Sequence, residues 1–218
     1  MKPLTHPGLV RRVRVVAPHP DDETIGAFGL MRQLSRHGVC VEVTIVTDGA
    51  ASHPASRAWP PERLRRARRR ETLAAVRLAG VHAGSVRFLD YPDGSLSALG
   101  EAPFRSLVQR LAAGPRPDLV LRPSLSDTHP DHGTVAEACR QAWPPGIPQA
   151  TYQVWPAHSQ PPGAKPFVLG RDQLVKQAAL RLYKSQTGLI TDDPDGFSMN
   201  RDLQRIFAGP VEWYGCGP

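Results

Sequence analysis

The sequence of 218 residues is poor in cysteine, in aromatic side chains and in long apolar runs, and each shortage argues against a class of protein. Its three cysteines, Cys40, Cys139 and Cys216, form no Cys-x-x-Cys pair, so neither a thiolate zinc knuckle nor a disulfide framework is expected. No run of about eighteen apolar residues is present, which excludes a membrane-spanning helix. Residues 1–14 are basic but lack an apolar stretch, so no signal peptide is predicted. The expected location is the bacterial cytoplasm.

The formal net charge of +7 comes mostly from arginine, which is densest between residues 63 and 70. A basic run can bind nucleic acid. Aromatic residues make up only 6% of the chain and do not interleave with this run, so few side chains are available to stack on bases. A solvated helix face is the simpler interpretation, and no nucleic-acid partner is expected. The arginines of the run are Arg63, Arg65, Arg66, Arg68, Arg69 and Arg70.

Short β-branched runs alternate with helical patterns along most of the chain. This rhythm predicts an α/β, Rossmann-like three-layer fold with a mostly parallel sheet and helices on both faces. The length fits a single domain covering residues 1–218. A Pro-rich connection over 156–166 and a turn-rich tail from 187 follow the regular part. The predicted strands are 13–17, 41–47, 86–89, 119–122 and 151–155, and the predicted helices are 24–37, 62–79, 104–113, 133–142 and 173–185.

Two His-Pro-Asp motifs follow predicted strands. His19-Pro20-Asp21-Asp22 comes directly after the first strand, and His129-Pro130-Asp131-His132 comes shortly after the fourth. In a doubly wound sheet of order 3-2-1-4-5 these strands are neighbours, and ligands bind beyond their carboxyl ends. The predicted site therefore lies at the C-terminal ends of strands one and four.

Helix capping is the simpler alternative for the first motif, because acids at a helix N-terminus gain about 0.3–1 kcal/mol. Capping can account for one or two of Asp21, Asp22 and Glu23. It explains neither the neighbouring histidine nor a second histidine–aspartate cluster after another strand. A nucleotide-binding Rossmann enzyme is disfavoured, because the first strand leads into these acids and not into a glycine-rich turn.

Together the motifs supply two histidines and an aspartate as metal ligands, with further acids to spare. Catalytic zinc sites use three such ligands and keep one position open. The metal lowers the pKa of bound water to about 7, a nearby carboxylate can take the proton, and an imidazolium can stabilise an oxyanion. These parts suit amide hydrolysis. Iron(II) is an alternative metal, since the same ligands accept it.

The residues resemble the PIG-L (LmbE-like) family of zinc-dependent N-acetylglucosaminyl de-N-acetylases. The segment Val15-Val16-Ala17-Pro18-His19-Pro20-Asp21-Asp22-Glu23 is similar to the first signature of the family. The segment from Pro123 to Asp127, with His129, Asp131 and His132, is similar to its second. Weaker similarity extends the resemblance over residues 13–186.

The resemblance implies a role for each site residue. It makes His19, Asp22 and His132 the zinc ligands and Asp21 the general base. The remaining residues implied to act are His129 as oxyanion stabiliser and acid, Asp131 as the group that orients or charges His129, and Arg68 and Asp93 as sugar contacts.

The resemblance implies a hydrolase that removes acetyl from the nitrogen of an N-acetylglucosamine-type conjugate. The alternatives are an amidase acting on a larger N-acyl group or a thiol conjugate, and a non-catalytic sugar- or nucleic-acid-binding module. The expected partner is a small N-acetylated amino-sugar conjugate. The sequence does not identify the group joined to the sugar in this conjugate. It also leaves the oligomeric state open, and a homo-oligomer is possible. The arginine-rich loop and helix lead to the hypothesis that the substrate is anionic.

Overall fold

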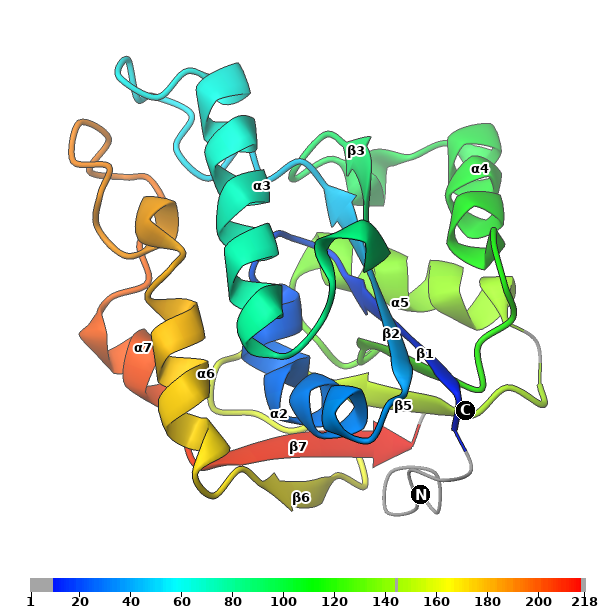
Figure 1. The fold of residues 1–218 in the computed structure, drawn as a ribbon. Helices are drawn as coiled ribbons and strands as arrows, with labels where there is room; N and C mark the ends of the chain where they lie inside the picture. Colours follow the sequence, from blue (N-terminus) through cyan, green and yellow to red (C-terminus); the bar gives the residue numbers. More distant parts are fainter. Residues whose placement is uncertain (1–9, 144, 217–218) are drawn as a thin grey trace.

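The fold of the chain was analysed in a computed structural model that describes residues 10–143 and 145–216 (Figure 1). The segment inspected for a signal peptide lies largely outside these residues. The strands form one sheet in the order β3-β2-β1-β4-β5-β7-β6. They are β1 (Arg12–Ala17), β2 (Cys40–Thr47), β3 (Val86–Tyr91), β4 (Leu119–Pro123), β5 (Gln149–Tyr152), β6 (Lys165–Val168) and β7 (Val211–Cys216).

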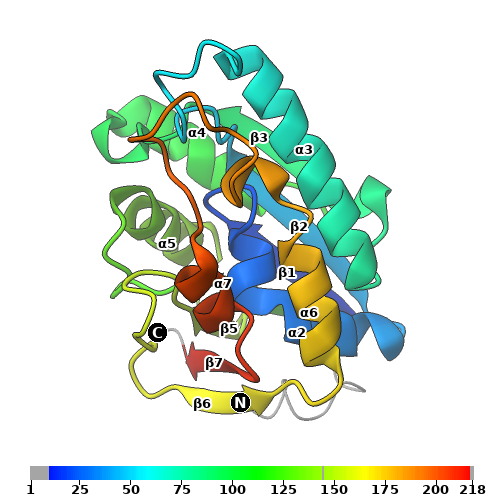
Figure 2. The ribbon, with the colours of Figure 1, turned by 90° about the vertical axis from the view of Figure 1, so that its left-hand side faces the viewer.

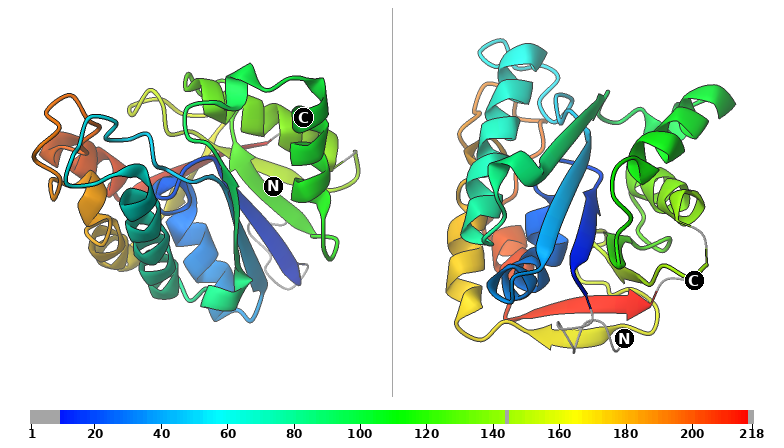
Figure 3. Two further views of the ribbon diagram at one scale, coloured as in Figure 1. Left: turned by 90° about the horizontal axis from the view of Figure 1, so that it is seen from above. Right: turned by 45° about the vertical axis from the view of Figure 1, so that its right-hand side comes forward.

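Helices cover both faces of this sheet, as the view on the right of Figure 3 shows. Helices α2, α3 and α6 lie on one face, and α4 and α5 pack together on the other. Among the described residues, every helix is too short or too polar to cross a membrane. The helices are α2 (Asp22–Arg36), α3 (Pro61–Leu78), α4 (Glu101–Ala112), α5 (Pro130–Ala142), α6 (Asp172–Leu180) and α7 (Arg201–Phe207), with 3-10 turns η2 (Ala83–Ser85), η3 (Leu96–Ala98) and η4 (Lys184–Gln186).

The predicted strand order is confirmed. Strand β1 pairs in parallel with β2 on one side and with β4 on the other, and β5 runs parallel to β4. The α/β class and the mostly parallel sheet are therefore as the sequence predicts. The carboxyl ends of β1 and β4 lie side by side, and this brings the two His-Pro-Asp motifs to one edge of the sheet.

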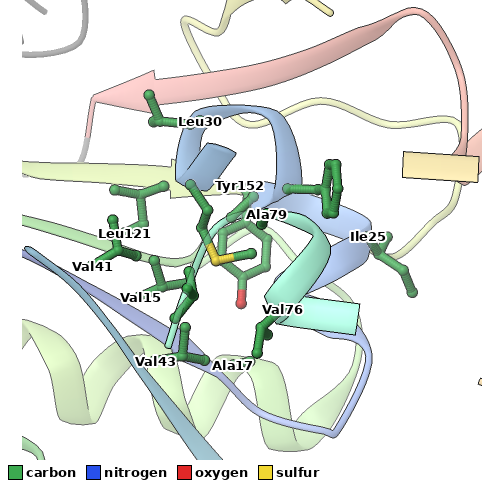
Figure 4. Close-up of a cluster of buried hydrophobic side chains, with 14 of the residues drawn as sticks. Val15, Ala17, Ile25, Leu30, Val41, Val43, Val76, Ala79, Leu121 and Tyr152 are labelled. Carbon is green, nitrogen blue, oxygen red and sulfur yellow. The ribbon is translucent and has the colours of Figure 1, made fainter. Parts of the chain in front are cut away.

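Two apolar cores hold the helices to the sheet, one on each face. Residues of one strand alternate between them because successive side chains point to opposite faces. Val15 and Ala17 of β1 face the core beneath α2 and α3, shown in Figure 4, whereas Val16 faces the core beneath α4 and α5. Helix α2 packs closely enough that a Cβ at Gly26 would lie 2.2 Å from the Tyr152 ring, so glycine is required there.

The largest differences from the sequence prediction lie after residue 156. Strand β6 begins at the end of the supposed Pro-rich connection and extends beyond it, and the supposed turn-rich tail contains α7 and β7. Strand β7 runs antiparallel to both β5 and β6. The pattern of β7 is misleading because an acid, Glu212, faces the interior and is only 4% exposed. Strand β5 also begins and ends earlier than predicted, and helix α5 begins three residues earlier, at Pro130.

A buried ion pair explains why Glu212 of β7 faces the interior of the protein. Lys176 of α6 donates to Glu212 at 2.7 Å and to the carbonyl of Ile25 in α2 at 2.6 Å. Both oxygens of Glu212 also lie 3.0 Å from the backbone N–H of Gly29, and one accepts the hydroxyl of Tyr214 at 2.5 Å. This network ties β7, α6 and α2 together behind the carboxyl edge of the sheet.

Two of the three cysteines are expected to react with a thiol reagent in the native protein. Cys40 and Cys216 are exposed, whereas Cys139 of α5 is buried, and burial raises the pKa of its thiol to about 12. Only the thiolate reacts, so at pH 8 Cys139 stays protonated as well as covered. Titration with Ellman's reagent should count two thiols natively and three in guanidinium. Three fast thiols in the native protein would contradict the packing of α5.

Candidate active site

The turn between β1 and α2 presents the first motif under strain. Asp21 has a φ of 146° and a ψ of −25°, a backbone conformation that residues other than glycine rarely adopt. Such conformations cost about 1–3 kcal/mol and cluster at functional sites. A side chain holds the turn in place: the carboxylate of Glu23 accepts the backbone N–H of Asp21 at 3.1 Å.

Glu23 is itself held by the C-terminal part of the chain. It is fully buried, and its carboxylate accepts hydrogen bonds from the hydroxyls of Thr24 and of Tyr183, which precedes η4. Burial raises the pKa of Glu23 to about 6, and these hydrogen bonds limit the rise. The turn that carries Asp21 is thus supported from α6 and η4.

Three donor atoms from the two motifs meet in a small triangle. His19 Nδ1 lies 3.2 Å from Asp22 Oδ2, His132 Nε2 lies 3.1 Å from the same oxygen, and the two ring nitrogens are 3.1 Å apart. His19 comes from the end of β1, Asp22 opens α2, and His132 lies in the first turn of α5. The fold therefore brings together the three residues that the sequence predicts as ligands.

This triangle fits a small divalent cation. A tetrahedral zinc ion with bonds of about 2.0–2.1 Å holds its ligand atoms about 3.3 Å apart, close to the spacing found here. Two imidazole nitrogens and a carboxylate oxygen are also the donor types that zinc prefers. Although burial opposes ionisation, the charge and hydrogen bonds of His132, with those of His19, hold the pKa of Asp22 far below its usual range. Asp22 therefore stays available as an anionic donor.

Other carboxylates fix the far sides of both histidine rings. Asp127 Oδ2 lies 3.0 Å from His132 Nδ1, close but not aligned as a hydrogen bond, and it also accepts the backbone N–H groups of Val154 and Trp155. His19 Nε2 lies 3.2 Å from Asp131 and 3.2 Å from Asp93. Carboxylates in this position orient the ring of a metal-binding histidine.

Asp131 acts on both His19 and His129, and its charge opposes the lowering of the pKa of His129. Its carboxylate accepts the backbone N–H groups of Gly94 and Leu96 at 2.9 Å, in addition to its contact with His19. What orients His129 is the backbone N–H of Asp131, which donates to His129 Nδ1 at 3.2 Å. The Asp131 side chain thus positions His19, and its backbone positions His129.

Asp21 lies beside the triangle and is paired with Arg68. Arg68 Nη2 lies 3.1 Å from Asp21 Oδ2 and donates to the carbonyl of Pro20 at 2.6 Å. Both side chains are buried. Burial raises the pKa of Asp21 to about 8, against the opposing charge of Arg68. Gly49, with a φ of 66°, makes room for this arginine, because a Cβ there would lie 2.9 Å from Arg68 Cδ.

His129 completes the cluster from the N-terminus of α5. Its ring centroid is 4.7 Å from that of His19 and 4.9 Å from that of His132. Burial and the charges of the other two histidines lower its pKa. Because its Nδ1 accepts the Asp131 N–H, a neutral His129 carries its proton on Nε2.

These residues form the floor of a pocket of about 520 Å³. Six of the eight residues singled out from the sequence line it, and Asp131 and His132 lie directly behind them. The lining residues from this set are His19, Asp21, Asp22, Arg68, Asp93 and His129.

The sequence interpretation gave no role to two carboxylates and to one wall of the pocket. Asp127 carries a usable signal, because it lies in the second motif segment, five residues before His132. Glu23 was assigned only to helix capping. The wall comes from Trp155 and from the segments around residues 51–54 and 186–197, and loops in this region carry no periodic signal.

Comparisons with known proteins identify a family and similar folds. The PIG-L family, described as GlcNAc-PI de-N-acetylase, matches residues 14–143. No curated protein matches the chain. The fold is similar to the N,N'-diacetylchitobiose deacetylase of Pyrococcus horikoshii, with a TM-score of 0.71 and 22% identity over 99% of this chain and 87% of that one.

Two further solved structures show how widely the fold is used. The antimicrobial reagent A40926 pseudoaglycone deacetylase has a TM-score of 0.66 and 25% identity over 94% of this chain and 96% of that one. The 4-carboxy-2-hydroxymuconate hydratase of Pseudomonas putida KT2440 has a TM-score of 0.65 and 16% identity over 94% and 95%. Fold alone therefore does not fix the reaction. The family match covers more than half of the sequence, including both motifs, and on this basis the chain belongs to the PIG-L family of de-N-acetylases.

Proposed function

We propose that this protein is a zinc-dependent hydrolase that removes the acetyl group from the nitrogen of an N-acetylglucosamine-type conjugate. The observation that carries the proposal is the triangle of His19, Asp22 and His132 donor atoms at the floor of a pocket, with Asp21 beside it. These three residues would hold the metal. When bound, zinc would lower the pKa of a water molecule and polarise the amide carbonyl.

The residues around the triangle supply the proton transfers. A divalent cation on the triangle would lower the raised pKa of Asp21, so that its carboxylate can take a proton from the attacking water, and Arg68 orients that carboxylate. His129 presents its Nε2 proton to the developing oxyanion as a hydrogen bond, and the proton that Asp21 has taken from the water passes to the departing amine. Asp127 orients the ring of His132, and Asp131 orients the ring of His19. Asp93 and Arg68 line the pocket, where the sugar is proposed to bind.

The proposal predicts metal content and acetate release together. Protein purified without chelator should carry about one zinc ion per chain by elemental analysis. It should release acetate from N-acetylglucosamine conjugates, lose this activity on dialysis against a chelator, and regain it with one equivalent of zinc. A series of acetyl, propionyl and butanoyl substrates tests the chain length of the acyl group. Metal-free protein that releases acetate at the same rate would refute the proposal.

A further inference from the structure

The outer wall of the pocket is built from two segments far apart in the sequence. The loop around residues 51–58 and the segment 186–197 lie together above the carboxyl edge of the sheet, as the cyan and orange segments in Figure 2 show. Asp192 accepts the hydroxyl of Ser56 at 2.7 Å and the N–H of Ala58 at 2.9 Å, and Asp193 accepts the N–H of Ala55 at 2.9 Å. Hydrogen bonds from the 51–58 loop to the carboxylates of Asp192 and Asp193 therefore hold the two segments of the wall together.

Aromatic rings line the wall on the side of β5. Trp155 packs edge-to-face on Phe197 with centroids 6.1 Å apart and on Phe207 at 5.6 Å. The backbone N–H of Trp155 is anchored on Asp127, which also contacts His132. Trp155 and Phe197 thus present a fixed apolar surface next to the proposed metal site. Such surfaces bind the C–H face of a sugar ring, or the face or edge of an aromatic ring.

The charged side chains that line the pocket are mostly acidic, which argues against the hypothesis of an anionic substrate. Of the arginines between residues 63 and 70, only Arg68 lines the pocket, and it is paired with Asp21. Arg69 instead pairs with Asp90, and Arg63 stacks on Trp59 at 4.0 Å. Arg65 and Arg66 both pair with Glu62.

An exposed acid, Asp195, also lines the pocket from the outer wall. Four aspartates and one arginine line the pocket, so even with a divalent metal ion on the triangle the charge of the lining, with its histidines neutral, is negative. We propose that Asp195, Trp155 and Phe197 form an outer subsite that selects conjugates whose second half is a neutral or cationic ring and disfavours phosphate- or carboxylate-bearing ones. The inference rests on the proposed function, because it concerns the part of the substrate beyond the acetylated sugar.

Three matched glycosides test this selectivity. The probes are glucosamine β-glycosides with 4-aminomethylphenyl, 4-hydroxymethylphenyl or 4-carboxyphenyl groups, which differ mainly in charge. Calorimetric binding of these glycosides, which the reaction does not consume, should fall in the order cationic, neutral, anionic. One exposed charge contact changes affinity about threefold to fivefold. The affinities of the cationic and the anionic glycoside should therefore differ about tenfold at low salt. In 0.5 M NaCl the difference should shrink to about twofold.

Variants assign the effect to the outer wall. Asp195→Asn should reduce the tenfold difference to about threefold, whereas Glu101→Gln, a matched loss of an exposed acid on α4, should leave it unchanged. Phe197→Leu should lower the affinity for all three glycosides about equally, because stacking on an apolar ring does not depend on the sign of the glycoside's charge. The anionic glycoside binding as tightly as the neutral one would overturn the inference, as would an unchanged ratio in Asp195→Asn.

Acetate release from the N-acetylated forms of the same glycosides separates the two proposals. If the binding order holds and none of them releases acetate, the proposed function fails and the outer subsite stands. If all three release acetate with equal kcat/KM and bind equally, the function stands and the outer subsite fails.

Discussion

Asp21→Asn is expected to lower kcat for acetate release by about a thousandfold while the protein still binds one zinc ion. General acid–base groups contribute about 10²–10⁴-fold, and asparagine cannot accept the proton of the attacking water. The substitution keeps the size of the side chain, and asparagine, like aspartate, is among the non-glycine residues found most often at a positive φ, which is 146° here. A loss in kcat with little change in KM would therefore report the chemical step.

Asp90→Asn is a closely matched control. Asp90 also has a positive φ, of 56°, and also pairs with an arginine of α3, Arg69 at 2.7 Å, but it lies outside the pocket. Its substitution should change kcat by less than twofold. Equal losses in both variants would mean that general damage to α3 contacts, and not the loss of a base, explains the effect. Retained activity in Asp21→Asn would remove Asp21 from the proposed mechanism.

Lys176→Met is expected to have the largest effect on stability, about 3–5 kcal/mol. Each side chain of the Lys176–Glu212 pair is only 2% exposed, so removing the lysine leaves an unpaired buried carboxylate. The free energy of unfolding can be measured with urea. The double variant Lys176→Met with Glu212→Gln should recover much of the loss, because the charge is then gone as well.

A lysine on the surface provides the control for this prediction. Lys165 of β6 is exposed, and Lys165→Met should change the free energy of unfolding by less than about 0.5 kcal/mol. A Lys176→Met protein within 1 kcal/mol of the wild type would show that the buried pair contributes little and that packing alone holds β7 to α2.

The sequence predicts the first two-thirds of the fold well because its signals there are local. Alternating β-branched strands, helices closed by glycine and a conventional strand order place the carboxyl ends of β1 and β4 together. The C-terminal third follows different rules. Glu212 faces the interior only because Lys176, 36 residues earlier, reaches it, and no periodicity records such a pairing.

The candidate site shows the same division. The proposed ligands His19, Asp22 and His132 lie in contiguous motifs, so their residue types and spacing are informative. The contacts that support the site are long-range. Tyr183 donates to Glu23, and Asp127, which lies beside His132, accepts the backbone N–H of Trp155. The sequence also does not show which arginines of α3 face the pocket, because their side-chain directions depend on tertiary packing, and Arg68 is the one that lines it.

The placement of β7 has a consequence for synthesis on the ribosome. This strand follows β6 in the sequence, yet it lies between β5 and β6 and is the partner of both. Until residue 216 has emerged, the outer edge of β5 stays unpaired, β6 has no strand to join, and Lys176 has no counter-charge. Open strand edges of this kind invite pairing with other chains. A nascent chain therefore exposes these strand edges until β7 has been made, although its proposed metal ligands are all synthesised by residue 132.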